Sequence, residues 1–252
     1  MNVSLRRLAA LALLVFAAGQ TLVLTELTHD NDNVGQAFTS AILAITLIVA
    51  GVVDRFDRWW SSTIALAASI LATITMLPYA DHIVYFDAAW EFSPIALVLL
   101  GSVAAAVFCT ADLVLRLRHR STTAPAWAAA GYGALVGGLA MLIVASFVLT
   151  YSSLDTVSAL EREGATELKM SEIKFKPSEL TAAVGEPVKL VVENDDLAPH
   201  TFVLAASWAA IDTRFNAGDE KLIAFTIAQP GAYEFRCDIE GHEKMKGTIN
   251  VR

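Results

Sequence analysis

The residues nearest the carboxyl terminus carry the side chains best suited to metal chemistry. Cys237, His242 and Met245 lie within nine positions, and His200 lies further upstream in the segment Pro-His-Thr-Phe. A thiolate, two imidazoles and a thioether form the donor set of a mononuclear copper site that transfers electrons. Soft sulfur donors favour Cu(I) and imidazole suits Cu(II), so a site with both kinds of donor can cycle between the two states.

Short strands are predicted on both sides of this cluster. Residues 233–237 alternate apolar and charged side chains, which is typical of a half-buried strand, and residues 247–251 follow as a closing strand. Cys237, His242 and Met245 are therefore expected on the loop between the last two strands. A binuclear copper site would need a second cysteine in this loop, and a zinc site would not recruit methionine, so the sequence favours neither.

Further short motifs surround the four candidate ligands. They are Phe175-Lys-Pro177, Val184-Gly185-Glu-Pro187-Val188, Val191-Val-Glu-Asn194-Asp, Pro199-His200-Thr-Phe202 and Ala217-Gly218-Asp219. Together with the cysteine loop, these motifs resemble the cupredoxin family, which includes plastocyanin, azurin and amicyanin. The resemblance covers about residues 166–252, and the gap of two residues between His242 and Met245 is shorter than in many relatives.

This resemblance implies a role for each candidate ligand. His200 and His242 would bind one type 1 copper ion through imidazole, Cys237 would bind it as thiolate, and Met245 would be the long axial ligand. The resemblance also implies that the backbone N–H of Thr201, next to the first histidine, donates a hydrogen bond to the cysteine sulfur.

The C-terminal third of the chain is predicted to be an all-β, Greek-key sandwich. Short segments with turn signals between them predict a β-sandwich, and the resemblance implies its Greek-key connections. The predicted strands are residues 168–175, 179–183, 188–194, 201–205, 222–227, 233–237 and 247–251. The predicted core residues are Phe175, Val188, Leu190, Val192, Phe202, Leu204, Phe225, Ile227, Tyr233 and Phe235.

The first two thirds of the chain have the composition of a membrane protein. Hydrophobic residues make up 55% of the whole chain, and its mean hydropathy is +0.53. Five apolar stretches are each close to the ~20 residues that a helix needs to cross a bilayer. They are residues 8–27, 37–53, 59–77, 94–115 and 126–151. We therefore expect a five-helix transmembrane region over residues 1–151, a juxtamembrane linker over 152–165 and the cupredoxin-like domain over 166–252.

The basic residues predict how these helices are oriented. The membrane region holds seven arginines and no lysine, and five spans place all seven on one side: Arg6, Arg7, Arg55, Arg58, Arg116, Arg118 and Arg120. The positive-inside rule assigns that side to the cytoplasm. We therefore expect a multi-pass protein of the cell membrane with a cytoplasmic N-terminus and an extracytoplasmic copper domain, away from the thiol-rich cytosol.

These features favour a membrane-anchored electron carrier that is not itself an enzyme. One alternative is a copper-binding protein that delivers copper to an extracytoplasmic cuproenzyme, and another is a subunit of a respiratory complex. The expected partners are the lipid bilayer and a redox protein such as a c-type cytochrome or an oxidase. The net charge of −8 argues against a nucleic-acid partner.

Two groups of polar residues on the outer side raise further hypotheses. His29 and His82 lie in acidic outer loops that could collect a second metal, although solvated loops are favoured. Acidic residues also flank the candidate ligands and predict a basic partner. They are Glu193, Asp195, Asp196, Asp238, Glu240 and Glu243.

Overall fold

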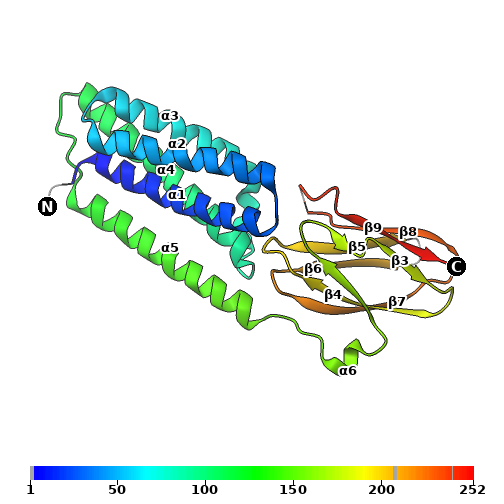
Figure 1. Cartoon of the computed structure of the whole chain (residues 1–252). Helices are drawn as coiled ribbons and strands as arrows, with labels where there is room; N and C mark the ends of the chain where they lie inside the picture. Colours follow the sequence, from blue (N-terminus) through cyan, green and yellow to red (C-terminus); the bar gives the residue numbers. More distant parts are fainter. Residues whose placement is uncertain (1–2, 207–208, 240) are drawn as a thin grey trace. The chain divides into compact units, whose positions relative to one another are not determined.

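The chain divides into two compact units. The computed structural model describes residues 3–206, 209–239 and 241–252. The first unit runs to Leu27 and resumes over Asn33–Phe147, and the second holds Thr28–Asp32 and Val148–Arg252. The first unit is helical, whereas the second is built mainly of strands (Figure 1).

The helical unit contains the predicted spans. Five helices of the described residues are long and apolar enough to cross a membrane, which confirms the prediction. They are α1 (Leu5–His29), α2 (Asn33–Arg55), α3 (Trp59–Met76) with the 3-10 helix η1 (Leu77–Val84), α4 (Ala89–Leu117) and α5 (Ala126–Ser152). Helix α4 begins before the predicted apolar run at Pro94. Its first turn can bury the carboxylate of Glu91 because Nδ1 of His82 lies 3.0 Å from that carboxylate.

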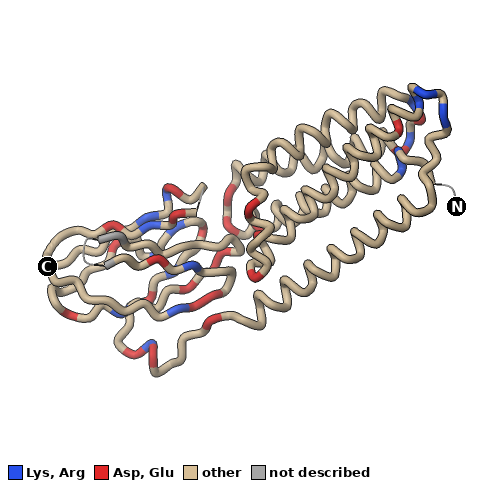
Figure 2. The backbone as a smooth tube through the Cα atoms, turned by 180° about the vertical axis from the view of Figure 1, so that it is seen from behind, with Lys and Arg blue, Asp and Glu red and all other residues tan. Residues whose placement is uncertain are grey.

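Charged side chains lie mainly at the ends of the membrane helices. Figure 2 shows basic residues gathered at the end of the helical unit nearest the N-terminus and acidic residues at the opposite end. At the basic end, Arg6 and Arg116 both pair with Asp57. Arg116 also pairs with the buried Asp112 at 2.7 Å, so the carboxylate within α4 belongs to a structural ion pair.

The second unit consists of two mixed sheets. One has the strand order β2-β1-β4-β7 and the other β3-β9-β8-β5-β6; β1 runs parallel to β4, and β3 parallel to β9. The strands are β1 (Thr166–Met170), β2 (Phe175–Lys176), β3 (Glu179–Ala182), β4 (Pro187–Asn194), β5 (His200–Ala206), β6 (Ala209–Phe215), β7 (Glu220–Thr226), β8 (Gly231–Arg236) and β9 (Lys246–Val251).

Two details of this unit differ from the predicted strands. The first predicted strand is broken between β1 and β2, because Glu172 and Ile173 adopt left-handed backbone conformations, with φ of 59° and 55°. Strand β6 was not predicted at all. It pairs with β5 along its whole length and forms an edge of its sheet, where alternate polar side chains such as Asp212 and Arg214 are tolerated.

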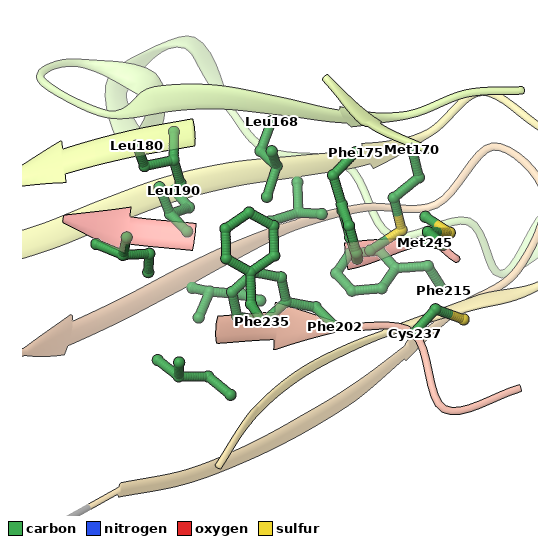
Figure 3. Close-up of a cluster of buried hydrophobic side chains, with 14 of the residues drawn as sticks. Leu168, Met170, Phe175, Leu180, Leu190, Phe202, Phe215, Phe235, Cys237 and Met245 are labelled. Atoms are coloured by element: carbon green, nitrogen blue, oxygen red, sulfur yellow. The ribbon is translucent and has the colours of Figure 1, made fainter. Parts of the chain in front are cut away.

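Aromatic rings fill the centre of the sandwich. Phe175, Phe202 and Phe235 pack with ring centroids 4.9–6.2 Å apart (Figure 3). Seven of the ten predicted core residues are buried, and Val188, Phe225 and Tyr233 pack against them while partly exposed. Met170 and Phe215 complete the core at the end that also holds Cys237 and Met245 (Figure 3). Truncating one such phenylalanine to alanine typically costs about 3–5 kcal/mol.

The segment before β1 is held against the edge strand β7. It contains the short helix α6 (Ala159–Arg162), which begins with a capping box formed by Ser158 and Glu161. The carboxylate of Glu220 accepts a hydrogen bond from the backbone N–H of Val157 and pairs with Arg162. Residues 155–162 therefore lie along the sandwich. The domain boundaries after residues 151 and 165 stay predictions.

Candidate metal centre

Strand pairing brings the candidate ligands together from distant parts of the sequence. His200 is the first residue of β5, and Cys237 directly follows β8. The two strands are antiparallel neighbours, with Val203 opposite Arg236, so the start of β5 lies beside the end of β8. The loop from β8 to β9 then carries His242 and Met245 back over the same end of the sheet.

Three donor atoms converge at this end of the sandwich. Nδ1 of His200 lies 3.1 Å from Nδ1 of His242, and the Cys237 sulfur lies 4.0 Å from the first of these nitrogens and 3.6 Å from the second. His200 and Cys237 are buried, while His242 is half-buried. One nitrogen of each ring and the sulfur therefore point at a common centre and could hold a metal ion.

Backbone hydrogen bonds fold the ligand loop tightly. The N–H of Cys237 donates to the carbonyl of Met245 at 3.0 Å, and the N–H of Met245 donates to the carbonyl of His242 at 2.8 Å. Gly241 has a φ of +89°, a left-handed conformation that glycine adopts without steric cost. The short His242-to-Met245 spacing is thus one closed turn, which keeps both residues at the same end of the domain.

The cysteine sulfur lies in a hydrogen-bonded environment that stabilises a thiolate. The backbone N–H of Thr201 donates to it at 3.3 Å, as the resemblance implies. Burial alone would raise the pKa of the Cys237 thiol. Hydrogen bonds from His200, His242 and the backbone N–H groups of Thr201 and Ile239 outweigh burial and lower this pKa to about 5.

The second nitrogen of the His200 ring has a charged partner. Nε2 lies 2.9 Å from the carboxylate of Asp196, and both side chains are buried. Burial acts to lower the pKa of His200, but hydrogen bonding to Asp196 and to the Cys237 sulfur raises it to about 9 in the metal-free protein. The ring is thus held at both nitrogens, and its Nδ1 edge faces the other donors.

Met245 lies on the core side of the centre. Its side chain is fully buried, and Figure 3 shows it at the end of the core where Cys237 lies, next to Met170. The structure therefore brings His200, Cys237 and His242 into one group, and Met245 into the adjoining core. The assignment of Met245 as axial ligand stays a prediction.

The outer-loop residues form a separate arrangement. His29, Asp30 and Asp196 lie close enough together to be considered for a metal. However, the Asp30 carboxylate accepts the backbone N–H groups of residues 197 and 198 at 3.0 and 3.2 Å and also contacts His29, so these oxygens are already used. His82 lies in another part of the described chain and pairs with Glu91. These contacts favour structural roles for both histidines.

The acidic residues around the centre are less available to attract a basic partner than the sequence predicts. Asp196 was expected at the surface, but it is buried because it pairs with His200. Glu240 lies outside the described residues. Salt bridges use three of the others: Glu193 and Asp195 with Lys169, and Asp238 with Arg236. Sequence reasoning missed the role of Asp196, and only its position four residues before His200 could have indicated it.

Comparison with known proteins identifies the type of domain in the C-terminal part of the chain. A family model described as a cupredoxin-like domain matches residues 139–251. The C-terminal part of the chain is a cupredoxin-like domain. A search of curated proteins gave no match. Five apolar helices, the last of which overlaps the start of the matched region, thus lead into the cupredoxin domain.

Solved structures of blue copper proteins are among those similar to the cupredoxin domain. Auracyanin A from Chloroflexus aurantiacus is 20% identical over 35% of this chain and 98% of its own, with a TM-score of 0.32. Reduced auracyanin from Roseiflexus castenholzii is 21% identical over 35% and 99%, with a TM-score of 0.31. A copper-containing nitrite reductase from Thermus scotoductus is 27% identical over 35% of this chain and 22% of its own, with a TM-score of 0.29.

Proposed function

We propose that this protein is a membrane-anchored electron carrier with one type 1 copper site on the outer side of the cell membrane. Its ligands would be His200, Cys237, His242 and Met245. The observation that carries the proposal is the convergence of two Nδ1 atoms and one sulfur within 4.0 Å of one another. Two imidazoles and a thiolate, with a thioether nearby, suit copper better than zinc.

The surrounding residues prepare the donors for a metal. The N–H of Thr201 and the depressed pKa of Cys237 both favour a thiolate at neutral pH. Asp196 leaves Nδ1 of His200 as the metal-facing nitrogen. When bound, copper would supply a one-electron couple between Cu(I) and Cu(II).

Burial of the donors favours electron transfer over copper delivery. Cys237 and Met245 are buried, so a metal held by them could be exchanged only after the ligand loop opens. An electron needs no such opening, because the half-buried ring of His242 would connect the site with the surface. We therefore place the contact surface of the redox partner around His242.

The helical unit anchors this carrier in the bilayer. The arginine-rich end of the helices would face the cytoplasm by the positive-inside rule, and five spans would then place the cupredoxin domain outside. A c-type cytochrome or an oxidase is the class of partner we propose. The salt bridges of the acidic residues leave only a modest electrostatic contribution to docking.

The test uses the full chain in detergent, loaded with Cu(II). We expect an intense visible band from thiolate-to-copper charge transfer, a matching EPR signal and reversible one-electron reduction. Cys237→Ser should remove the band, while Cys109→Ala, which changes the other cysteine, should retain it. A colourless wild type, or a coloured Cys237→Ser variant, would refute the site. Rapid Cu(I) transfer without stable Cu(II) would favour copper delivery.

A further inference from the structure

The turn between β1 and β2 has an unusual backbone. Ser171 and Lys174 are joined by a hydrogen bond from N–H to carbonyl at 2.9 Å, and the two residues between them, Glu172 and Ile173, are both left-handed. This conformation is uncommon for any residue except glycine and is a clear outlier for a β-branched residue such as isoleucine. Surrounding structure must therefore hold the turn in this shape.

The anion that this turn binds is the carboxylate of Asp196. Consecutive N–H groups in such a turn point into one concavity, which is suited to a negative charge. The N–H of Glu172 donates to one carboxylate oxygen at 2.8 Å, and the N–H of Ile173 donates to the other at 2.9 Å. The second oxygen also faces Nε2 of His200 at 2.9 Å. The carboxylate thus joins the turn to the candidate copper ligand.

We propose that Asp196, held by the left-handed turn at Glu172 and Ile173, is a positioning residue that aims Nδ1 of His200 at the metal. This inference rests on the copper site proposed above. An acceptor at Nε2 keeps the proton on that nitrogen, leaves the lone pair of Nδ1 free and fixes the plane of the ring. A carboxylate acceptor also makes the imidazole a stronger donor, which stabilises Cu(II) over Cu(I) and lowers the reduction potential.

The arrangement explains why a strained turn stands next to the metal centre. A water molecule or a mobile side chain could accept the same hydrogen bond, but neither would hold the ring in one orientation. Asp196 is itself fixed at both oxygens, and its backbone N–H donates to the side chain of Asn194 at 3.0 Å. Such fixed outer partners of metal-bound histidines typically contribute about 10–100-fold to metal affinity.

The experiment compares three variants of the full chain with the wild type. Asp196→Ala removes the acceptor, and Asp196→Asn keeps the shape but leaves only one oxygen for three donors. Glu172→Gly is the matched control, because glycine accepts the left-handed conformation and retains the N–H group. The readouts are copper affinity, reduction potential, EPR hyperfine splitting and, in the diamagnetic Cu(I) form, the NMR tautomer of His200.

We expect Asp196→Ala to weaken copper binding by about 10–100-fold and to raise the reduction potential. Asp196→Asn should also lower the copper affinity and raise the reduction potential, each by a smaller amount. This variant tests the proposal if the alanine variant does not fold. Glu172→Gly should match the wild type. An unchanged potential, affinity and tautomer in the folded Asp196 variants would overturn the proposal. A wild type that binds no copper would instead refute the underlying site.

Discussion

Asn194 at the end of β4 provides a quantitative test of how the ligand-bearing loop is held. Its side chain is fully buried and makes three hydrogen bonds to backbone atoms. Nδ2 donates to the carbonyls of Ala198 at 2.9 Å and Phe215 at 3.3 Å, and Oδ1 accepts the N–H of Asp196 at 3.0 Å. Asn194 therefore closes the loop that leads into His200.

Truncation of this side chain should be strongly destabilising. Asn194→Ala removes all three hydrogen bonds, and at about 1 kcal/mol each they contribute about 3 kcal/mol to the free energy of unfolding. That is a large share of the 5–15 kcal/mol typical of a whole domain. Since about 1.4 kcal/mol changes an equilibrium tenfold, the unfolded fraction of the domain should rise by roughly 100-fold.

Limited proteolysis can measure this change in the domain alone. The chain has no lysine before Lys169, so a protease specific for lysine cuts only in the cupredoxin domain. Where opening is fast relative to cleavage, the cleavage rate follows the population of the open form. We expect roughly 100-fold faster cleavage of Asn194→Ala in metal-free protein, by the conversion above.

Asn250→Ala is the matched control for this measurement. Asn250 is exposed on β9, and exposed substitutions usually change stability by less than about 0.5 kcal/mol. Its cleavage rate should therefore stay close to that of the wild type. If Asn194→Ala were also cleaved at nearly the wild-type rate, the three hydrogen bonds would not hold the loop, and the reasoning would be wrong.

Four further predictions concern the metal, the membrane and the partner. Met245→Leu should keep copper and colour but raise the reduction potential, because the oxidised ion loses a donor. Met170→Leu, the control in the adjoining core, should leave copper binding, colour and potential unchanged, and equal behaviour of the two variants would exclude Met245 as a ligand. In metal-free protein, the ultraviolet absorbance of the Cys237 thiolate should persist as the pH falls and disappear only near pH 5; loss near pH 9 would contradict the hydrogen-bonded thiolate. A reporter that is active only outside the cytoplasm should be active when fused after Arg252, and activity of a cytoplasmic reporter there would overturn the five-span orientation. Electron transfer to a basic cytochrome should slow modestly as ionic strength rises, and Glu243→Lys should flatten that dependence; a rate that increases with salt would exclude acidic steering.

Local sequence features were sufficient to predict the five apolar helices and to place Cys237, His242 and Met245 on one loop. A span is determined by the length and hydropathy of one continuous segment, so the five apolar stretches became α1 to α5 with only small shifts at their ends. Cys237, His242 and Met245 share one short loop, so their proximity follows from chain connectivity. The alternation in residues 233–237 likewise predicted β8 and the buried face that ends at Cys237.

Only the tertiary structure could decide what surrounds these residues. His200 is 37 positions from Cys237, and the two meet because β5 and β8 are neighbours, a pairing that no local pattern specifies. Asp196 looked like one more surface carboxylate, yet the left-handed turn at Glu172 and Ile173 draws it inward and onto His200. The physical reason is that helices and strands repeat with a period that sequence can show, whereas loops are shaped by hydrogen bonds between distant segments.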